Sequence, residues 1–167
     1  RPPPPAPPGT PRGPAPPSPT RIARATSPAT QYVPGPPSGA ALGTTPINGV
    51  TAPFPGQPIP GFSGILNLPN GRILGLPDNG FGSKANSADY LLQLNVVRPN
   101  WKTASAATGP GNDGAAAVEK TIRLSDPWKL AGFPLTRADR KLTGADFDLE
   151  SIQPGYLGDL WIGEEFG

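Results

Sequence analysis

The sequence predicts an all-β protein that contains about one and a half blades of a β-propeller, preceded by a disordered, proline-rich segment. Several short segments between residues 62 and 163 alternate apolar with polar side chains, which is the period-two pattern of half-buried strands. This strand pattern begins again after 87 residues, as expected for a repeated unit. The first 37 residues hold 15 of the 27 prolines. These observations divide the chain into a leading segment, residues 1–55, and a folded part, residues 56–167.

Residues 1–55 are expected to be disordered, with polyproline II character where the prolines cluster. The only charged residues in this segment are four arginines, and the first acidic residue of the chain is Asp78. So little apolar mass cannot offset the entropy lost on ordering. Residues 16–19 could be a proline-rich ligand for a partner domain; the alternative is a plain linker.

The composition excludes several kinds of active site. The chain has no cysteine, histidine or methionine. Zinc sites of the Cys/His type, cysteine nucleophiles and Ser-His-Asp triads are therefore excluded within it. From Asp139 onward, seven acidic residues accompany two basic ones, which argues against a nucleic-acid partner for the folded part. No apolar run approaches the length of a transmembrane helix.

Four strands are predicted in the first repeat. Residues 62–66 and 72–76 flank Asn70-Gly71, a dipeptide that readily takes the positive φ angles of a tight hairpin turn. Residues 90–97 and 118–124 supply the third and fourth strands. Strands that follow one another in this way predict one antiparallel sheet. The polar residues 135–143 are expected to contain a single helical turn.

The pattern restarts at residues 145–152 and 159–163. Shifting the sequence by 87 residues lays Gly71 on Gly158 and Asp78 on Glu165, so strand, turn, strand and acidic loop recur in order. Repeated four-stranded units indicate a β-propeller, with Phe62 and Trp161 as core residues between blades. A propeller closes with about four to eight blades, so further blades are expected to be needed and the present residues alone are expected to be inactive.

Three acidic residues alternate with apolar ones at Asp146, Asp148 and Glu150. On a strand, their side chains would share one face, with attachment points about 6.6 Å apart. Like charges so close raise one another's pKa unless a cation lies among them, and oxygen ligands suit Ca²⁺ or Mg²⁺. The alternative is a solvated strand edge.

Two further acidic sites complete the predicted set. Glu164 and Glu165 end the last strand, and Asp78 occupies the corresponding place one repeat earlier. Water activated by a cation would be the nucleophile that a site without histidine or cysteine needs, with Glu150 and Glu165 as the catalytic candidates. Loop solvation for Glu165 and ordinary turn chemistry for Asp78 are the alternatives. The predicted metal ligands are Asp78, Asp146, Asp148, Glu150, Glu164 and Glu165.

Basic residues near these acids are candidates for binding an anionic substrate. Lys84 follows a Gly-Phe-Gly-Ser run that lacks the spacing of a P-loop. Arg137, Arg140 and Lys141 precede the acidic segment and could instead pair with its carboxylates. An ordinary surface position is the alternative for Lys84.

Three segments, at residues 56–94, 142–151 and 160–167, carry the motifs DNGFGSKANSADY, DFDLES and EEFG in that order. Together they resemble the bacterial phytase-like family, which is described as having esterase-like activity, and correspond to its N-terminal part. The resemblance implies a secreted, periplasmic or envelope-associated β-propeller hydrolase, similar to calcium-dependent phytases and acting on a small anionic or ester substrate. A non-catalytic envelope propeller, with its acid clusters as structural ion sites, stays open because propellers host both functions.

Overall fold

The computed structural model describes residues 20–107 and 109–166, and these form an almost entirely β structure, as predicted. Besides ten strands it contains two three-residue 3₁₀ segments. The strands are β1 (Ala23–Arg24), β2 (Tyr32–Val33), β3 (Gln57–Pro58), β4 (Phe62–Leu68), β5 (Arg72–Pro77), β6 (Gln93–Pro99), β7 (Lys102–Thr103), β8 (Ala116–Arg123), β9 (Leu149–Pro154) and β10 (Leu160–Glu164). The 3₁₀ segments are η1 (Ala40–Leu42) and η2 (Pro69–Gly71). Within the described residues, no helix has the length and apolar character needed to cross a membrane.

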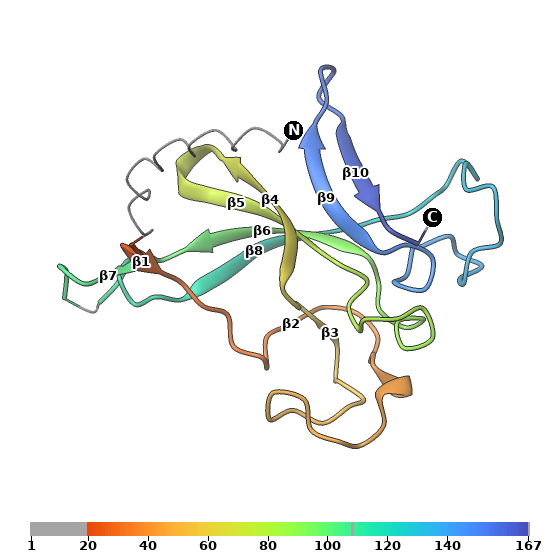
Figure 1. The fold of residues 1–167 in the computed structure, drawn as a ribbon, viewed down its shortest axis with the longest axis horizontal. Coiled ribbons are helices and arrows are strands. Elements are labelled where there is room, and N and C mark those ends of the chain that lie inside the picture. Colours follow the sequence, from red (N-terminus) through yellow and green to blue (C-terminus); the bar gives the residue numbers. More distant parts are fainter. Residues whose placement is uncertain (1–19, 108, 167) are drawn as a thin grey trace, which may run out of the picture.

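The centre of the molecule is a four-stranded antiparallel sheet in the order β4-β5-β6-β8 (Figure 1). The order of these four strands in the sheet is the same as their order in the sequence, which confirms the predicted antiparallel sheet. The turn between β4 and β5 also forms as predicted, since Asn70 and Gly71 take φ angles of 62° and 70°. Short pairs of strands, β1 with β7 and β2 with β3, lie outside this sheet.

The second hairpin, β9 with β10, repeats the first one in detail. A shift of 87 residues carries β4 onto β9 and β5 onto β10. Each hairpin breaks its pairing at the same place, between Phe62 and Gly64 in the first and opposite the Gly163/Glu164 step in the second. The residues left unpaired at these bulges are Ser63 and Glu150. One four-stranded sheet followed by the start of another is compatible with consecutive propeller blades.

The core lies between the central sheet and the second hairpin. Leu149 and Ile152 of β9 are buried with apolar side chains of the central sheet. Gly64 makes this close packing possible, because a Cβ atom there would lie 2.8 Å from Cγ2 of Ile152. The buried apolar residues of this core are Leu74, Leu76, Tyr90, Leu92, Leu94, Leu149 and Ile152.

Several residues in 20–55, within the segment predicted to be disordered, pack against the rest of the chain. Val33 and Phe54 are buried, with 6% and 7% of their surface exposed. The carbonyl of Pro34 accepts a hydrogen bond from Arg123, and the Asp89 carboxylate accepts the N–H of Gly39 at 2.9 Å. These partners lie far along the chain, so the local composition carries no sign of them. The expectation for residues 1–19, including the proline-rich stretch 16–19, lies outside the described residues.

Three further local predictions are wrong. Residues 135–143 contain a turn at Ala138 and Asp139 rather than a helical turn. The strand predicted from residue 145 begins at Leu149, because the chain forms a turn just before it. Trp161, predicted to lie in the core, is 70% exposed. Phe62, by contrast, packs its ring directly over Gly75.

Candidate carboxylate site

Three carboxylates converge beside the second hairpin. Asp148 precedes β9, Glu150 lies at the bulge of β9, and Glu165 follows β10. One carboxylate oxygen from each lies within 4.8 Å of the other two. Two oxygens that each lie about 2.4 Å from one ion are at most about 4.8 Å apart, so the three can share a divalent cation. The donors are all oxygen atoms, which suit Ca²⁺ or Mg²⁺.

The acidic loop that follows the first hairpin, residues 78–80, binds the carboxylate of Asp148. Asp148 is buried, and its Oδ1 accepts a 3.0 Å hydrogen bond from the main-chain N–H of Asn79. The Asn79 side-chain amide donates to Asp148 Oδ2 at 2.8 Å. Asn79 is itself fixed, since its Oδ1 accepts the N–H groups of Phe81 and Gly82 at 3.2 and 2.7 Å. Each carboxylate oxygen of Asp148 therefore accepts one such bond, which orients the group.

Two glycines allow the chain segments around the site to approach one another. Gly80 has a φ of +91°, and a Cβ atom there would lie 2.3 Å from Cγ of Tyr90. At Gly144, a Cβ atom would lie 1.9 Å from the carbonyl oxygen of Asn79. A side chain at Gly80 would displace the acidic loop from Tyr90, and a side chain at Gly144 would push that loop away from the segment that carries Asp148.

The cluster raises the pKa of Glu150, one of its two exposed members. Loss of solvation raises the pKa of Glu150 above its ordinary value, and the nearby charge of Asp148 raises it further. A hydrogen bond with Ser63 acts in the opposite direction, and the carboxylates of Glu165 and Asp78 add smaller upward contributions. Repulsion of this kind favours a proton or a cation at the site.

Asp78 lies at the edge of the cluster. Its Oδ1 accepts the N–H of Gly80 at 2.8 Å, which is the turn chemistry weighed for it from the sequence. It acts on Glu150 through its charge, but it does not belong to the group of three converging carboxylates.

Asp146 does not share a face with Asp148 and Glu150, because residues 145–148 are not strand. Its Oδ1 accepts hydrogen bonds from the N–H and hydroxyl of Thr136 at 2.7 and 2.8 Å. Its Oδ2 accepts the N–H and hydroxyl of Thr143 at 2.7 and 2.9 Å. Four donors on a buried carboxylate make Asp146 a structural anchor for the turn before β9.

Glu164 and Lys84 line a pocket of about 410 Å³ that does not include the three converging carboxylates. Glu164 accepts the N–H of Phe166 at 3.0 Å. The Lys84 ammonium lies 4.4 Å from the centroid of the Phe166 ring. Glu165 belongs to the carboxylate cluster, whereas its neighbours Glu164 and Phe166 line the pocket. The side chains at the end of β10 therefore contribute to two different sites.

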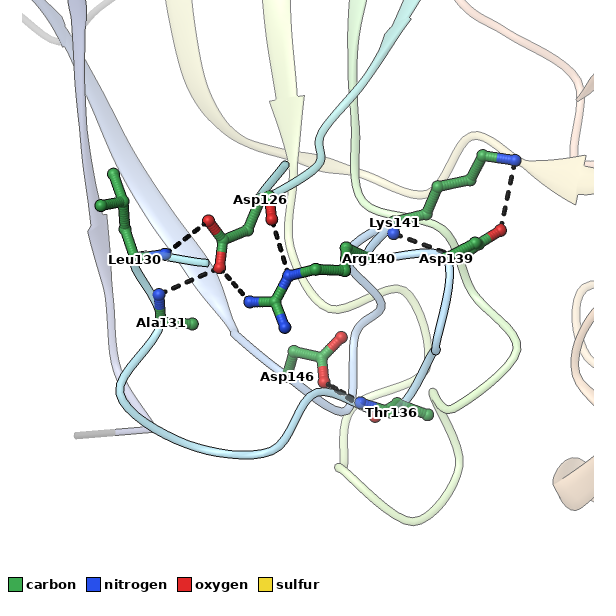
Figure 2. Close-up of polar contacts among 8 residues, drawn as sticks. All are labelled: Asp126, Leu130, Ala131, Thr136, Asp139, Arg140, Lys141 and Asp146. Atoms are coloured by element: carbon green, nitrogen blue, oxygen red, sulfur yellow. Dashed lines mark hydrogen bonds and ion pairs between the residues drawn. The ribbon is translucent and has the colours of Figure 1, made fainter. Parts of the chain in front are cut away.

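The other three basic candidates pair with acids outside the cluster. Figure 2 shows the pairs that Arg140 and Lys141 form. Arg140 forms an ion pair with the Asp126 carboxylate and donates to the Asp126 carbonyl at 2.7 Å. Asp126 also accepts the N–H groups of two following residues, Leu130 and Ala131, at 2.8 and 3.0 Å. Arg137 and Lys141 both pair with Asp139. These ion pairs stabilise the conformation of the loop between β8 and β9.

Sequence reasoning missed Asn79 as a part of the site. Its place in an Asp-Asn-Gly turn was visible, but its partner Asp148 lies 69 residues further along the chain. The repeat was the one available signal, because it set this loop in correspondence with the acidic end of β10.

Comparison with known proteins gives one match. The model of the phytase-like family, described as esterase-like activity of phytase, matches residues 57–167. This range contains both hairpins and every residue of the carboxylate cluster. Neither the curated proteins nor the solved structures include a match to the chain.

Proposed function

The chain belongs to the phytase-like family, and we propose that it forms part of a hydrolase that cleaves phosphoester or ester bonds of its substrate. The proposed active site is formed by Asp148, Glu150 and Glu165. The observation that carries the proposal is the convergence of three carboxylate oxygens within 4.8 Å of one another. Family membership supports the reaction class, and the all-oxygen donor set fits a divalent cation. We propose Ca²⁺ as that cation, since hard oxygen ligands in a partly exposed, irregular arrangement suit it.

The three carboxylates have different surroundings and therefore different proposed roles. Asp148, buried and held by Asn79, is the oriented ligand. Glu165 is the second ligand, and its N–H donates to the Asp148 carbonyl at 3.0 Å. A divalent cation bound here supplies positive charge that polarises an ester or phosphoryl oxygen and favours loss of a proton from water.

Glu150 is the proposed general base, because it is exposed and one of its carboxylate oxygens lies within 4.8 Å of an oxygen of each proposed ligand. It takes a proton from water as the water oxygen bonds to the acyl carbon or the phosphorus. The bond to the leaving alcohol oxygen then breaks, and the alcohol departs with the proton that Glu150 took from water.

Three expectations from the sequence remain proposals. A closed propeller needs about four to eight blades, so we propose that further strands complete the ring around this site. Extracellular or envelope placement follows from the family resemblance. Lys84 is retained as a proposed contact to an anionic substrate because it lines a pocket next to the end of β10.

The test is hydrolysis by the intact protein with its ring complete. Phytate, 4-nitrophenyl phosphate and 4-nitrophenyl butyrate are offered with Ca²⁺ or with a chelator. We expect calcium-dependent turnover that falls by about 10²–10⁴-fold in Glu150→Gln, the range for loss of a general base. Glu119→Gln, on β8, is the matched control. Full activity in both Glu150→Gln and Glu165→Gln would overturn the proposal. Calcium binding without turnover would favour the structural ion site of a binding module.

A further inference from the structure

An apolar pocket of about 340 Å³ lies between residues 29–60 and the loop that follows β5. Its volume falls in the range of small-molecule sites and suits a group of phenyl or butyl size. The large apolar side chains that line it are Leu42, Ile47, Val50, Phe54, Ile59 and Phe81.

The walls of this pocket are held in place before any ligand arrives. Phe54 is buried, and its ring centroid lies 5.7 Å from that of Phe81, which in turn lies 5.4 Å from Tyr90. Ile47 and Val50 exchange main-chain hydrogen bonds of 2.8 and 2.9 Å across a tight turn. A preformed pocket avoids the ordering cost that a flexible one would carry on binding.

One short segment belongs both to this pocket and to the carboxylate site. Gly80 lines the pocket, and its N–H donates to the Asp78 carboxylate at 2.8 Å. The residue before it, Asn79, holds Asp148 through two hydrogen bonds. The apolar pocket and the carboxylate site therefore share one loop, in which Asp78, Asn79 and Gly80 follow one another.

We propose that this pocket binds the apolar acyl or aryl group of an ester whose reacting bond lies at the carboxylate site. This inference rests on the proposed function and narrows it to esters that carry an uncharged apolar group. An inositol phosphate offers no such group, so it would leave the pocket empty. The polar end of the ester then faces the carboxylates, while its apolar end is removed from water against Phe54 and Phe81.

Binding is measured with compounds that cannot turn over. Acetanilide, propionanilide and butyranilide place an amide where the ester would be, and the 167-residue chain is titrated with each while its amide ¹H–¹⁵N signals are recorded. We expect saturable shifts at Val50, Phe54, Gly80 and Phe81. Affinity should rise about fourfold per added methylene, as expected for burial of one CH₂ group.

Variants at an exposed lining residue test the location. Ile47 is 44% exposed, so Ile47→Trp can fill the mouth of the pocket without disturbing the core, and it should weaken butyranilide binding at least tenfold. Ile122→Trp, at a similarly exposed position on β8, should bind as the unchanged chain does. Ile47→Ser should weaken binding less than Ile47→Trp, and the dispersion of the amide signals verifies folding in every variant.

The outcomes separate this inference from the proposed function. Hydrolysis of 4-nitrophenyl phosphate by the intact protein, with no anilide binding at the lining residues, would overturn the pocket and leave the hydrolase. Anilide binding that depends on Ile47, without turnover of any ester, would support the pocket and overturn the hydrolase. Shifts spread over the surface with no dependence on chain length would overturn the pocket directly.

Discussion

The main-chain N–H and the side-chain amide of Asn79 donate hydrogen bonds of 3.0 and 2.8 Å to the carboxylate of Asp148, which lies 69 residues further along the chain in the second repeat. The 87-residue shift places Phe166, not a second asparagine, at the position equivalent to Asn79. The repeats have therefore diverged in role. The first supplies the group that orients, and the second supplies the converging carboxylates.

Replacing Asn79 tests this link. Asn79→Ala removes the amide from buried Asp148 and leaves the Phe81 and Gly82 N–H groups without their acceptor. We expect the free energy of unfolding to fall by about 1–3 kcal/mol, the usual cost of buried groups left unsatisfied. Urea unfolding measures the change, and Asn67→Ala, exposed on β4, is the control. An equal effect of the two substitutions would contradict the role assigned to Asn79.

Gly80 and Gly82 offer a matched pair in one loop, because both have positive φ angles, +91° and +77°. A Cβ atom at Gly82 has no neighbour within 4 Å, so Gly82→Ala should cost only the backbone strain of about 1–2 kcal/mol. Gly80→Ala should cost a further 1–3 kcal/mol or so, because its methyl group would overlap the Tyr90 ring. Chemical denaturation of both variants compares the two, and equal losses would argue against the close packing of this loop.

The contact between Gly64 and Ile152 joins the central sheet to the second hairpin. Ile152→Ala should cost about 2–5 kcal/mol through the cavity it leaves. Gly64→Ala should cost about 1–3 kcal/mol through overpacking. Since the cavity makes room for the new methyl group, the double variant should be about 0.5–3 kcal/mol more stable than the sum of the single losses predicts. Gly64→Ala combined with Val33→Ala should be additive, and additivity in both pairs would contradict the contact.

The pH dependence of stability should include a contribution from Asp126. Hydrogen bonds from the N–H groups of Ala131 and Leu130, followed by Arg140, lower the pKa of Asp126 to about 2. A folded-state pKa below the unfolded value contributes stability above about pH 4, and that stability is lost as the pH falls through about 2. Asp126→Asn should therefore melt lower than the unchanged chain at pH 7, and the gap should narrow between pH 4 and pH 2.

Arg140→Gln separates the causes of that shift. Because the main-chain hydrogen bonds are the larger causes, this variant should keep most of the acid-dependent loss. Thermal melting across the pH range measures both variants. A gap between Asp126→Asn and the unchanged chain that stays constant from pH 7 to pH 2 would contradict the prediction.

Calcium should stabilise the chain if Asp148 and Glu165 bind it and the nearby charge of Glu150 attracts it. A ligand at 100 times its dissociation constant adds about 2.7 kcal/mol to the free energy of unfolding. We expect the melting temperature to rise with Ca²⁺ and to return with a chelator. The double variant Glu150→Gln/Glu165→Gln should lose this rise, whereas Asp113→Asn/Glu119→Gln, which removes two carboxylates elsewhere, should keep it. A rise that persists without the clustered glutamates would place the ion at another site.

Much of the fold could be predicted because its signals are local. Asn70-Gly71 requires no distant partner to favour a turn, and the alternation along β6 and β8 is visible in a few residues. The repeat also survives in detail, down to the bulges at Ser63 and Glu150. Residues 145–148 misled the prediction, because alternation indicated a strand while four hydrogen bonds to Asp146 favour a turn there.

The sequence by itself determined the β class, the order of the strands, the 87-residue repeat and a set of acidic residues able to bind a cation. Tertiary structure decided which of those acids meet. Asp148, Glu150 and Glu165 converge. Asp146 instead accepts hydrogen bonds from two threonines, and Asp78 accepts one from the main chain of its own turn. Strand periodicity depends on neighbours one or two residues away, so it can be recognised in the sequence. Convergence depends on how the second hairpin and the segment before it pack on the first repeat, through Gly64 and Gly144, and no local pattern contains that information.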